Sequence, residues 1–249
     1  MEIATVIDQI VRRIGSRVQL TDGDRAMIES LPIKIRTLEP STYLLREGQR
    51  PQRCAFIVDG FAYRQKLTPN GEREIVSILM PGEFVDVQNL FLDESDHDIQ
   101  ALTRITIAEV MIPALRDLAL GCPAVNKALW IDALVEASTH REWLLNIGRR
   151  NAKTRMAHLL CEFCVRLQIS AVGQTRACEM PMTQEQLGDA LGLTPVHVNR
   201  IVRKLRGEGA LELSGGTLII ADLPLLGKIA GFGDNYLHRR LRPRPAALG

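Results

Sequence analysis

The sequence has no apolar run approaching the roughly 18 to 20 residues that a membrane-spanning helix needs. Residues 1–20 alternate apolar and polar side chains and contain no signal-peptide core. No low-complexity tract is present, and 46% hydrophobic with 24% charged residues is an ordinary globular composition. These absences predict a cytoplasmic protein with no membrane association. Its 249 residues suffice for one large domain or two modest ones.

Cysteine is scarce and scattered, and its odd count of five argues against a disulfide framework. Cys161 and Cys164 form a C-x-x-C pair, which leaves redox or metal chemistry open as one interpretation. The pair lies in a helical run whose apolar residues recur on one face, and no second C-x-x-C completes a tetrahedral site. We therefore interpret both thiols as packing residues.

Charge is divided unevenly along the chain. Residues 1–150 hold 18 Lys and Arg against 21 Asp and Glu, a net charge of −3. Residues 151–249 hold 13 against 8, a net charge of +5. This division indicates that only the second part meets a polyanion.

Residues 30–115 show short strand-like runs separated by turn residues. The expected strands are 43–45, 55–58, 61–67, 74–79 and 106–112. Pro69-Asn70-Gly71 is typical of a hairpin, because Asn-Gly tolerates the positive φ angles of a tight reversal. Such even spacing favours an antiparallel jelly roll or small barrel.

After Pro113 the pattern becomes helical. Residues 124–151 contain no proline and one glycine, Gly148, and they are too apolar for a free helix. A helix that pairs with a partner's helix explains this, and a helix packed on its own barrel is the alternative. A second helix is expected over 152–170. Further on, Ser214-Gly215-Gly216 between two apolar runs indicates a hairpin in the position of a wing.

Residues 183–205 carry the punctuation of a helix-turn-helix. Thr183 followed by Gln186 is a capping box that starts one helix. Gly192 stands where the chain must leave that helix through a left-handed conformation. Thr194 then caps a second helix with Pro195 at its first position, where a missing N–H has no cost.

The second of these helices has two distinct faces. Its apolar face holds residues 198, 201, 202 and 205, and its other face carries four positive charges with no acid before Glu208. Such a helix fits the major groove, where its first turns read base edges and later basic residues meet phosphates. The candidate DNA contacts are Thr183, Gln184, Thr194, Val196, His197, Asn199, Arg200, Arg203 and Lys204. An amphipathic helix with a merely solvated basic face is the alternative.

Over residues 28–226 the sequence resembles the Crp/Fnr family, the cyclic-AMP receptor protein and its relatives. The matching motifs are Leu44-x-x-Glu47-Gly48, Phe56-Ile57-Val58-x-Gly60, Pro81-Gly82-Glu83-Phe84 and the helix-turn-helix. The resemblance implies an α+β protein that binds a palindromic operator in double-stranded DNA as a homodimer and acts on RNA polymerase. It implies a β-roll with an N-terminal helix over 1–120, a dimerisation helix over 121–151 and a winged helix over 152–228. For residues 229–249 we expect a disordered tail.

The match to the family's recognition pattern is partial. In the cyclic-AMP receptor type, an Arg-Glu pair and a later arginine contact bases. Arg200 matches the later arginine, whereas Pro195-Val196 replaces the pair. Val196 cannot accept a hydrogen bond from a cytosine amine, although it can meet a thymine methyl group. The operator sequence is therefore left open.

The ligand site departs further from the family. Asp86-Val87 stands where nucleotide-binding members have Gly-Glu, and residues 95–98 stand where they have a phosphate-binding arginine. The nearest arginine, Arg104, lies past that position. Because an acidic cluster repels a cyclic phosphate, cyclic AMP is not the expected effector. The run from Asp93 to Asp98 could bind a cation, but we interpret it as a solvated turn.

No cofactor is assigned from the sequence. No cysteine precedes Cys54, so the N-terminal iron–sulfur cluster of oxygen-sensing relatives is unsupported. A cyclic-nucleotide- or haem-responsive regulator of the same fold is the alternative, with His97 and Cys54 as the candidate haem ligands in the β region. A cupin-type metalloenzyme is a remote alternative, because the chain has no His-x-His motif. No catalytic or metal-binding residue is predicted. A third possible class of function is a regulatory module whose recognition helix does not bind DNA.

Overall fold

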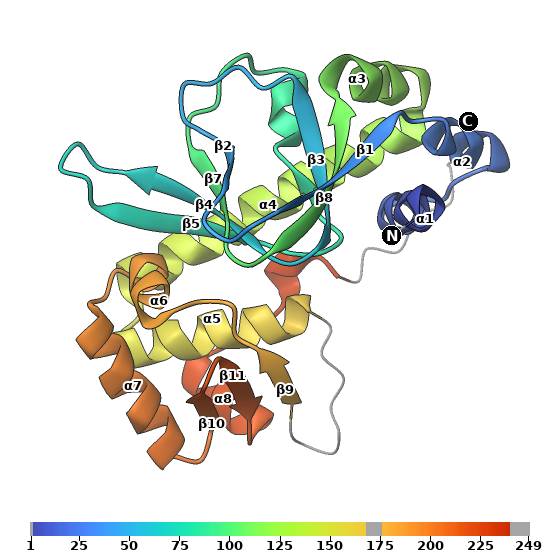
Figure 1. Cartoon of the computed structure of the whole chain (residues 1–249). Coiled ribbons are helices and arrows are strands. Elements are labelled where there is room, and N and C mark those ends of the chain that lie inside the picture. Colours follow the sequence, from blue (N-terminus) through green and yellow to red (C-terminus); the bar gives the residue numbers. More distant parts are fainter. Residues whose placement is uncertain (1, 168–175, 240–249) are drawn as a thin grey trace. The chain divides into compact units, whose positions relative to one another are not determined.

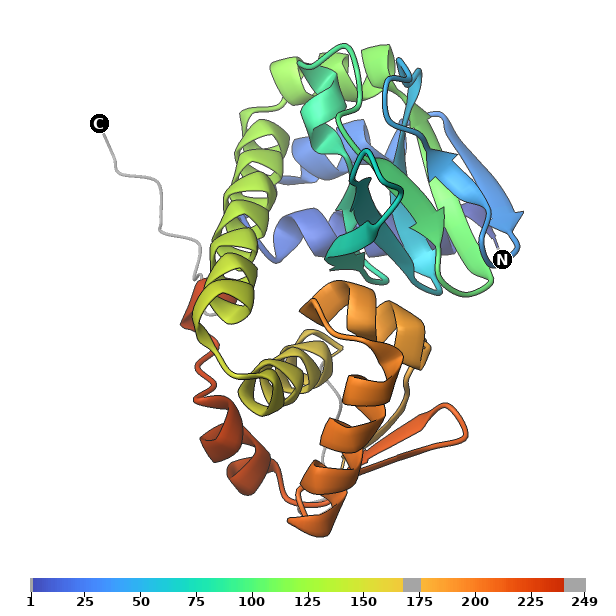
Figure 2. The same cartoon turned by 90° about the vertical axis from the view of Figure 1, so that its left-hand side faces the viewer.

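The computed structural model describes residues 2–167 and 176–239, which divide into two compact units (Figures 1 and 2). Unit 1 is formed by residues up to 64, by 78–137 and by 238–239. Unit 2 is formed by residues 65–77 and 138–237. The division falls inside the long helix, where the sequence-based prediction has a separate linking segment. The three-part division by residue number therefore remains a prediction.

Two four-stranded sheets form the N-terminal β-roll, with strand orders β1-β8-β3-β6 and β2-β7-β4-β5. The strands are β1 (Ile33–Leu38), β2 (Tyr43–Leu45), β3 (Arg53–Asp59), β4 (Ala62–Leu67), β5 (Arg73–Leu79), β6 (Phe84–Val85), β7 (Asp98–Ala101) and β8 (Ile105–Met111). Pairs β1–β8, β3–β8, β3–β6 and β2–β7 are antiparallel. The predicted antiparallel β-roll is confirmed.

Helices cover the first of these sheets in unit 1. They are α1 (Ile3–Gly15), α2 (Asp22–Glu29), the 3-10 helix η1 (Val87–Leu90) and α3 (Ile112–Gly121). Buried side chains of α1 and α3 join those of β3 and β8 in one apolar core, with Phe56 edge-on to Phe84 at 5.1 Å between ring centroids. This core holds the β-roll against its helices.

The long helix α4 (Pro123–Arg149) follows α3 directly. Its bounds lie within two residues of the helix expected over 124–151. Within the described part of the chain, no single helix is long and apolar enough to cross a membrane. Only α3 and α4 taken together reach that length and apolarity, and they are bent by 115° at their junction.

Unit 2 contains the winged helix-turn-helix. Its elements after α4 are α5 (Ala152–Arg166), β9 (Arg176–Glu179), α6 (Gln184–Leu191), α7 (Pro195–Gly207), β10 (Leu211–Ser214), β11 (Thr217–Ile220), α8 (Leu223–Ala230) and the 3-10 helix η2 (Asn235–Leu237). The wing is an antiparallel sheet of order β10-β11-β9. Gly215 and Gly216 have positive φ angles of 57° and 77°, as the expected glycine turn requires.

The tail is where the prediction from sequence fails. Residues 229–249 were expected to be disordered, yet residues 229–239 are described, and they include the end of α8 and η2. The prediction was wrong there because Tyr236 stacks on His158 of α5 and Leu237 is buried, which sequence composition does not reveal. Residues 240–249 lie outside the described residues.

Candidate nucleic-acid interface

Both helices of the motif begin with the expected caps. The backbone N–H of Gln186 donates to the Thr183 hydroxyl at 3.2 Å, and the Gln186 side chain accepts from the Thr183 N–H at 2.9 Å. The Thr194 hydroxyl accepts from the backbone N–H of His197 at 3.3 Å, and Pro195 is the first helical residue. The caps fix where α6 and α7 start, and therefore where their side chains project.

Two glycines shape the turn between α6 and α7. Gly192 has a φ of 60° and ends α6 in the left-handed conformation that the sequence predicted. Gly188 was not singled out from sequence, although a Cβ atom there would lie 2.4 Å from the carbonyl oxygen of Leu193. The chain therefore returns so closely over α6 that only glycine fits at residue 188.

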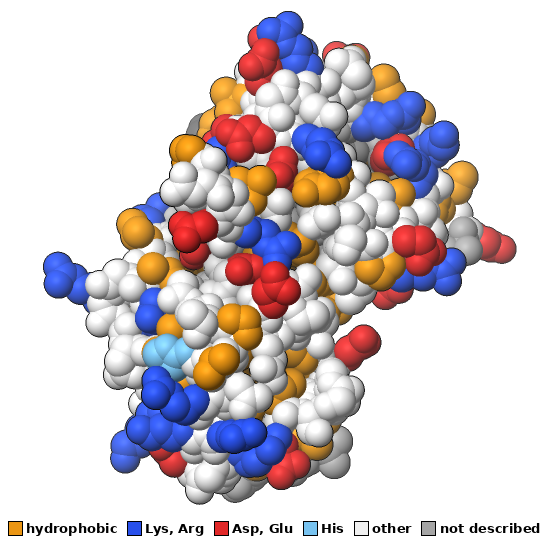
Figure 3. Space-filling model, turned by 60° about the vertical axis from the view of Figure 1, so that its left-hand side comes forward, with side chains coloured by type: hydrophobic (Ala, Val, Ile, Leu, Met, Phe, Trp, Pro, Cys, Tyr) orange, Lys and Arg blue, Asp and Glu red, His pale blue; other side chains and the backbone are white. Residues whose placement is uncertain are grey.

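The candidate DNA contacts share the outer side of the motif. Val196 is 82% exposed, and Arg200, Arg203 and Lys204 are also exposed. Lys and Arg side chains gather over this part of unit 2 in Figure 3. The opposite face of α7 is buried, as its apolar spacing predicted. The outer face therefore offers positive charge and one bare apolar side chain to a ligand.

The remaining candidates lie beside this face. Thr183, Gln184 and Thr194 are exposed, while His197 and Asn199 are half-buried. The Asn199 side-chain amide donates to the Gln184 side-chain oxygen at 3.4 Å, which brings candidates from α6 and α7 together. No nucleic acid is present, so the contacts themselves stay predictions.

Arg206, near the end of α7, makes a hydrogen bond to the wing. Its guanidinium donates to the carbonyl oxygen of Leu213 at 2.8 Å and so ties α7 to the wing strand β10. Arg206 is the fourth of the positive charges predicted for the outer face, with Arg200, Arg203 and Lys204, and it is exposed. Its hydrogen bond makes it a brace between the recognition helix and the wing.

The ligand region of the β-roll is filled by the protein's own charges. Arg64, on β4, is buried and donates to Asp86 at 2.7 Å, its Nε lies 2.9 Å from Nε2 of His97, and it also pairs with Glu136 of α4. His97 lies 2.6 Å from Asp96 through Nδ1 and 3.1 Å from Asp86 through Nε2. The buried guanidinium of Arg64 therefore lies beside Asp86, the first residue of the Asp86-Val87 pair that stands in place of the family's Gly-Glu pair.

These contacts determine the protonation states of Asp86 and His97. Burial acts to raise the pKa of the Asp86 carboxyl, but the hydrogen bond from His97 and the charge of Arg64 outweigh it and leave that pKa lowered. Burial acts to lower the pKa of His97, but its hydrogen bond to Asp86 and the charge of Asp86 outweigh it and leave that pKa raised. Asp86 is therefore ionised, and His97 protonates more readily than an ordinary histidine.

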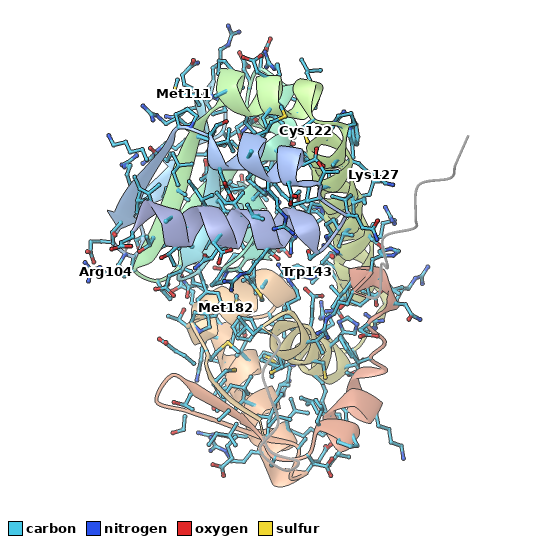
Figure 4. All side chains as sticks on the ribbon, turned by 90° about the vertical axis from the view of Figure 1, so that its right-hand side faces the viewer. Arg104, Met111, Cys122, Lys127, Trp143 and Met182 are labelled. Carbon is cyan, nitrogen blue, oxygen red and sulfur yellow. The ribbon has the colours of Figure 1, made fainter. Side chains whose placement is uncertain are left out.

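The interpretation of residues 93–98 as a solvated turn holds for Asp93, Glu94 and Asp96, which are exposed, but is wrong for Ser95 and His97. Ser95 and His97 are buried, and Asp98 accepts from the backbone N–H of Glu47 at 2.8 Å as β7 begins. Arg64 was not predicted as part of this region from sequence. Its one signal was a charged residue within the expected strand 61–67. Arg104, labelled in Figure 4, is exposed and lies 3.5 Å from Glu39.

The candidate haem ligands and the thiol pair have partners of their own. Both ring nitrogens of His97 face carboxylates, as described above. The Cys54 thiol donates to the carbonyl oxygen of Val85 at 3.0 Å, and burial raises its pKa to about 12, which disfavours a ligating thiolate. Cys161 and Cys164 are buried on α5, in keeping with a packing role. Among residues 2–167 and 176–239, no group of three His, Cys, Asp or Glu side chains is placed to hold a metal ion.

Two family models match the chain, one for each part of this architecture. The model described as a cyclic nucleotide-binding domain matches residues 35–120. The model described as a Crp-like helix-turn-helix domain matches residues 154–229. The first covers the β-roll without testing its ligand, and the second covers every candidate DNA contact.

Relatives and solved structures agree with these models. The transcriptional activator protein FnrL of Cereibacter sphaeroides is 26% identical over 200 residues, covering 79% of this chain and 80% of that protein. The nitrogen fixation regulation protein FixK of Rhizobium meliloti is 29% identical over 184 residues, covering 73% and 80%. The structure of FixK2 from Bradyrhizobium japonicum has a TM-score of 0.74 at 22% identity and covers 82% of this chain and 100% of that one. With its β-roll, long helix and capped recognition helix in this order, the chain belongs to the Crp/Fnr family of transcription regulators.

Proposed function

We propose that this protein is a transcription factor that binds a palindromic DNA operator as a homodimer. The observation that carries the proposal is the outer face of α7, with Arg200, Arg203 and Lys204 exposed and the helix braced against a wing by Arg206. A positive helix of this kind enters the major groove and gains affinity from phosphates.

Within this docking mode the residues take separate roles. Val196 and Arg200 lie toward the start of α7, where side chains reach base edges in the groove. Arg200 suits the N7 and O6 atoms of a guanine, and Val196 suits a thymine methyl group. Arg203 and Lys204, a turn later, suit phosphates. Capping by Thr183 and Thr194 orients backbone N–H groups and holds this arrangement.

The homodimer is supported by the outer face of α4. Trp130, Leu134, Leu144 and Leu145 are 54%, 62%, 74% and 45% exposed, although all are large apolar side chains. Steps of three and four residues keep Trp130, Leu134, Ala137 and Leu144 on one side of the helix, where Arg141 is the one charged residue among them. Phe91, 63% exposed, stacks on Trp130 at 6.3 Å and widens the apolar surface. A second α4 is the partner that buries such a stripe.

Two further parts of the proposal concern signal and partners. Because Arg64, Asp86 and His97 satisfy one another inside the β-roll, we propose that its effector is not cyclic AMP. Because the matched relatives carry names of transcriptional activators, we propose RNA polymerase as a second partner. Binding to the bacterial chromosome would place the protein in the cytoplasm.

Arg200→Ala is the variant that tests recognition. If Arg200 reads a base, the variant should lose about 1–3 kcal/mol of affinity for the selected operator and should tolerate any base at one position of each half-site. Fluorescence anisotropy on operators changed at each position in turn measures both effects. The exposed Arg12→Ala, on α1 in unit 1, is the matched control and should bind as the unsubstituted protein does. Equal weakening on every sequence would assign Arg200 to a phosphate instead.

A further inference from the structure

One buried carboxylate joins three separate parts of unit 2. Glu162, on α5, is 1% exposed. It accepts from Nε1 of Trp143 on α4 at 3.1 Å to each oxygen, and Trp143 is labelled in Figure 4. It also accepts from the Tyr236 hydroxyl at 2.7 Å and from Arg166 at 3.2 Å. The end of the long helix, the first helix of the DNA-binding part and the C-terminal segment therefore meet at one group.

Further buried contacts surround Glu162. His158 of α5 is 1% exposed and lies against Phe232 and Tyr236, with ring centroids at 5.0 and 5.8 Å. Its Nε2 lies 3.2 Å from Glu142 of α4, which in turn pairs with Arg150 at 2.6 Å. The α5 helix therefore has a second close polar contact with α4, between His158 and Glu142.

The protonation states of His158 and Tyr236 determine which groups donate hydrogen bonds around Glu162. Burial, reinforced by the charge of Arg150, lowers the pKa of His158 to about 4, so this ring is neutral near neutral pH. Burial and the charge of Glu162 raise the pKa of Tyr236, so its hydroxyl remains a donor. Trp143 and Arg166 are donors only. Every partner of Glu162 therefore requires an acceptor, and a carboxylate alone offers acceptors in all directions.

The contacts continue from this junction to the recognition helix. α5 packs on α6, on α7 and on α8, all within unit 2. Gly231 ends α8 in a left-handed conformation and turns the chain so that Phe232 and Tyr236 reach α5. Glu162 thus lies where α5, on which α7 packs, contacts the end of α4 that carries Leu144 and Leu145.

We propose that Glu162 is a positioning residue that fixes the direction of the recognition helix relative to α4, and that it thereby sets the half-site spacing the dimer accepts. This inference rests on the proposed function, because spacing has meaning only for a dimer on a palindrome. Two recognition helices must enter successive major grooves about 34 Å apart, so a small change in their direction misplaces one of them. Half-site binding needs one recognition helix only and does not depend on this angle.

Glu162→Gln tests the inference with almost no change of volume. The amide places N–H donors against the donors of Trp143, Tyr236 or Arg166, so at least one of the three contacts is lost. The probes are one half-site duplex and a series of palindromes with different spacings, built from the sequence that the unsubstituted protein selects. We expect unchanged half-site affinity, about tenfold weaker binding to the best palindrome and a flatter dependence on spacing. Glu179→Gln, an exposed carboxylate on β9 of the same unit, should change neither.

Tyr236→Phe is the second variant, because it removes one hydroxyl and leaves Glu162 charged. It should shift the spacing dependence in the same direction by a smaller amount, and it decides the matter if Glu162→Gln does not fold. Unchanged, sharp spacing dependence in both variants overturns the inference and leaves the dimer proposal intact. An unsubstituted protein with no preference for any spacing would contradict the dimer proposal itself.

Discussion

Leu134→Glu should convert the protein to a monomer and lower its affinity for the full palindrome by about 10²–10⁴. Leu134 is 62% exposed on the outer face of α4, one turn after Trp130 in the apolar stripe that we assign to the dimer seam. In that seam a glutamate would bury two unpaired carboxylates, one from each copy. Without the dimer, the second half-site no longer binds as part of one molecule, and affinity falls toward that of a half-site.

Light scattering and a gel-shift titration on the same sample decide this prediction. Leu120→Glu is the matched control, because Leu120 is an equally apolar residue of α3 and is 71% exposed outside the stripe. It should remain dimeric and bind the palindrome with unchanged affinity. Tight palindrome binding by a demonstrably monomeric Leu134→Glu protein would rule out the seam on α4.

Arg64→Met should destabilise the β-roll by about 3–5 kcal/mol, because it leaves buried charges without their partner. Arg64 holds Asp86 at 2.7 Å and Glu136 of α4, and both Arg64 and Asp86 are buried. Methionine fills the space of the side chain's stem but offers no donor. Urea unfolding followed by circular dichroism measures the loss in the transition that includes the β-roll.

The loss should depend on pH with a defined sign. The charge of Arg64 acts to lower the pKa of His97, so removal of Arg64 lets that pKa rise further. A raised folded-state pKa adds stability below the unfolded value, about 6.5, and this stability disappears as pH rises through the folded value. The defect should therefore be larger at about pH 8 than at about pH 6.

The double variant Arg64→Met with Asp86→Asn is the control for this account. Asparagine removes the orphaned charge and tolerates the left-handed backbone of residue 86, whose φ is 54°. It should recover part of the lost stability and weaken the pH dependence. A single variant as stable as the unsubstituted protein at every pH would contradict the role assigned to Arg64.

The helix-turn-helix could be predicted from sequence because its determinants are local. Thr183, Gly192 and Thr194 each act on backbone groups within a few residues, so their spacing alone defines where α6 and α7 begin and end. The hairpin strands β4, β5, β10 and β11 were recognisable for the same reason. The two faces of α7 likewise follow from residues three and four apart.

The parts that sequence did not predict depend on distant partners. β6 has two residues and β7 has four, so neither carries a readable period, and both exist through pairing with β3 and β2. Arg64 meets Glu136 across 72 positions, and Tyr236 meets Glu162 across 74. A single sequence does not pair such residues, and so the buried network of the β-roll and the fixed C-terminal segment emerged only from the structure.

Selection of bound duplexes from a random DNA library is the most direct test of the central claim. If two recognition helices of a dimer dock together, the enriched site should be a palindrome with half-site centres about 10 to 11 base pairs apart. Its half-sites should specify bases under the start of α7. Enrichment of no common sequence, or of a single unrepeated half-site by a dimeric protein, would contradict the proposed function.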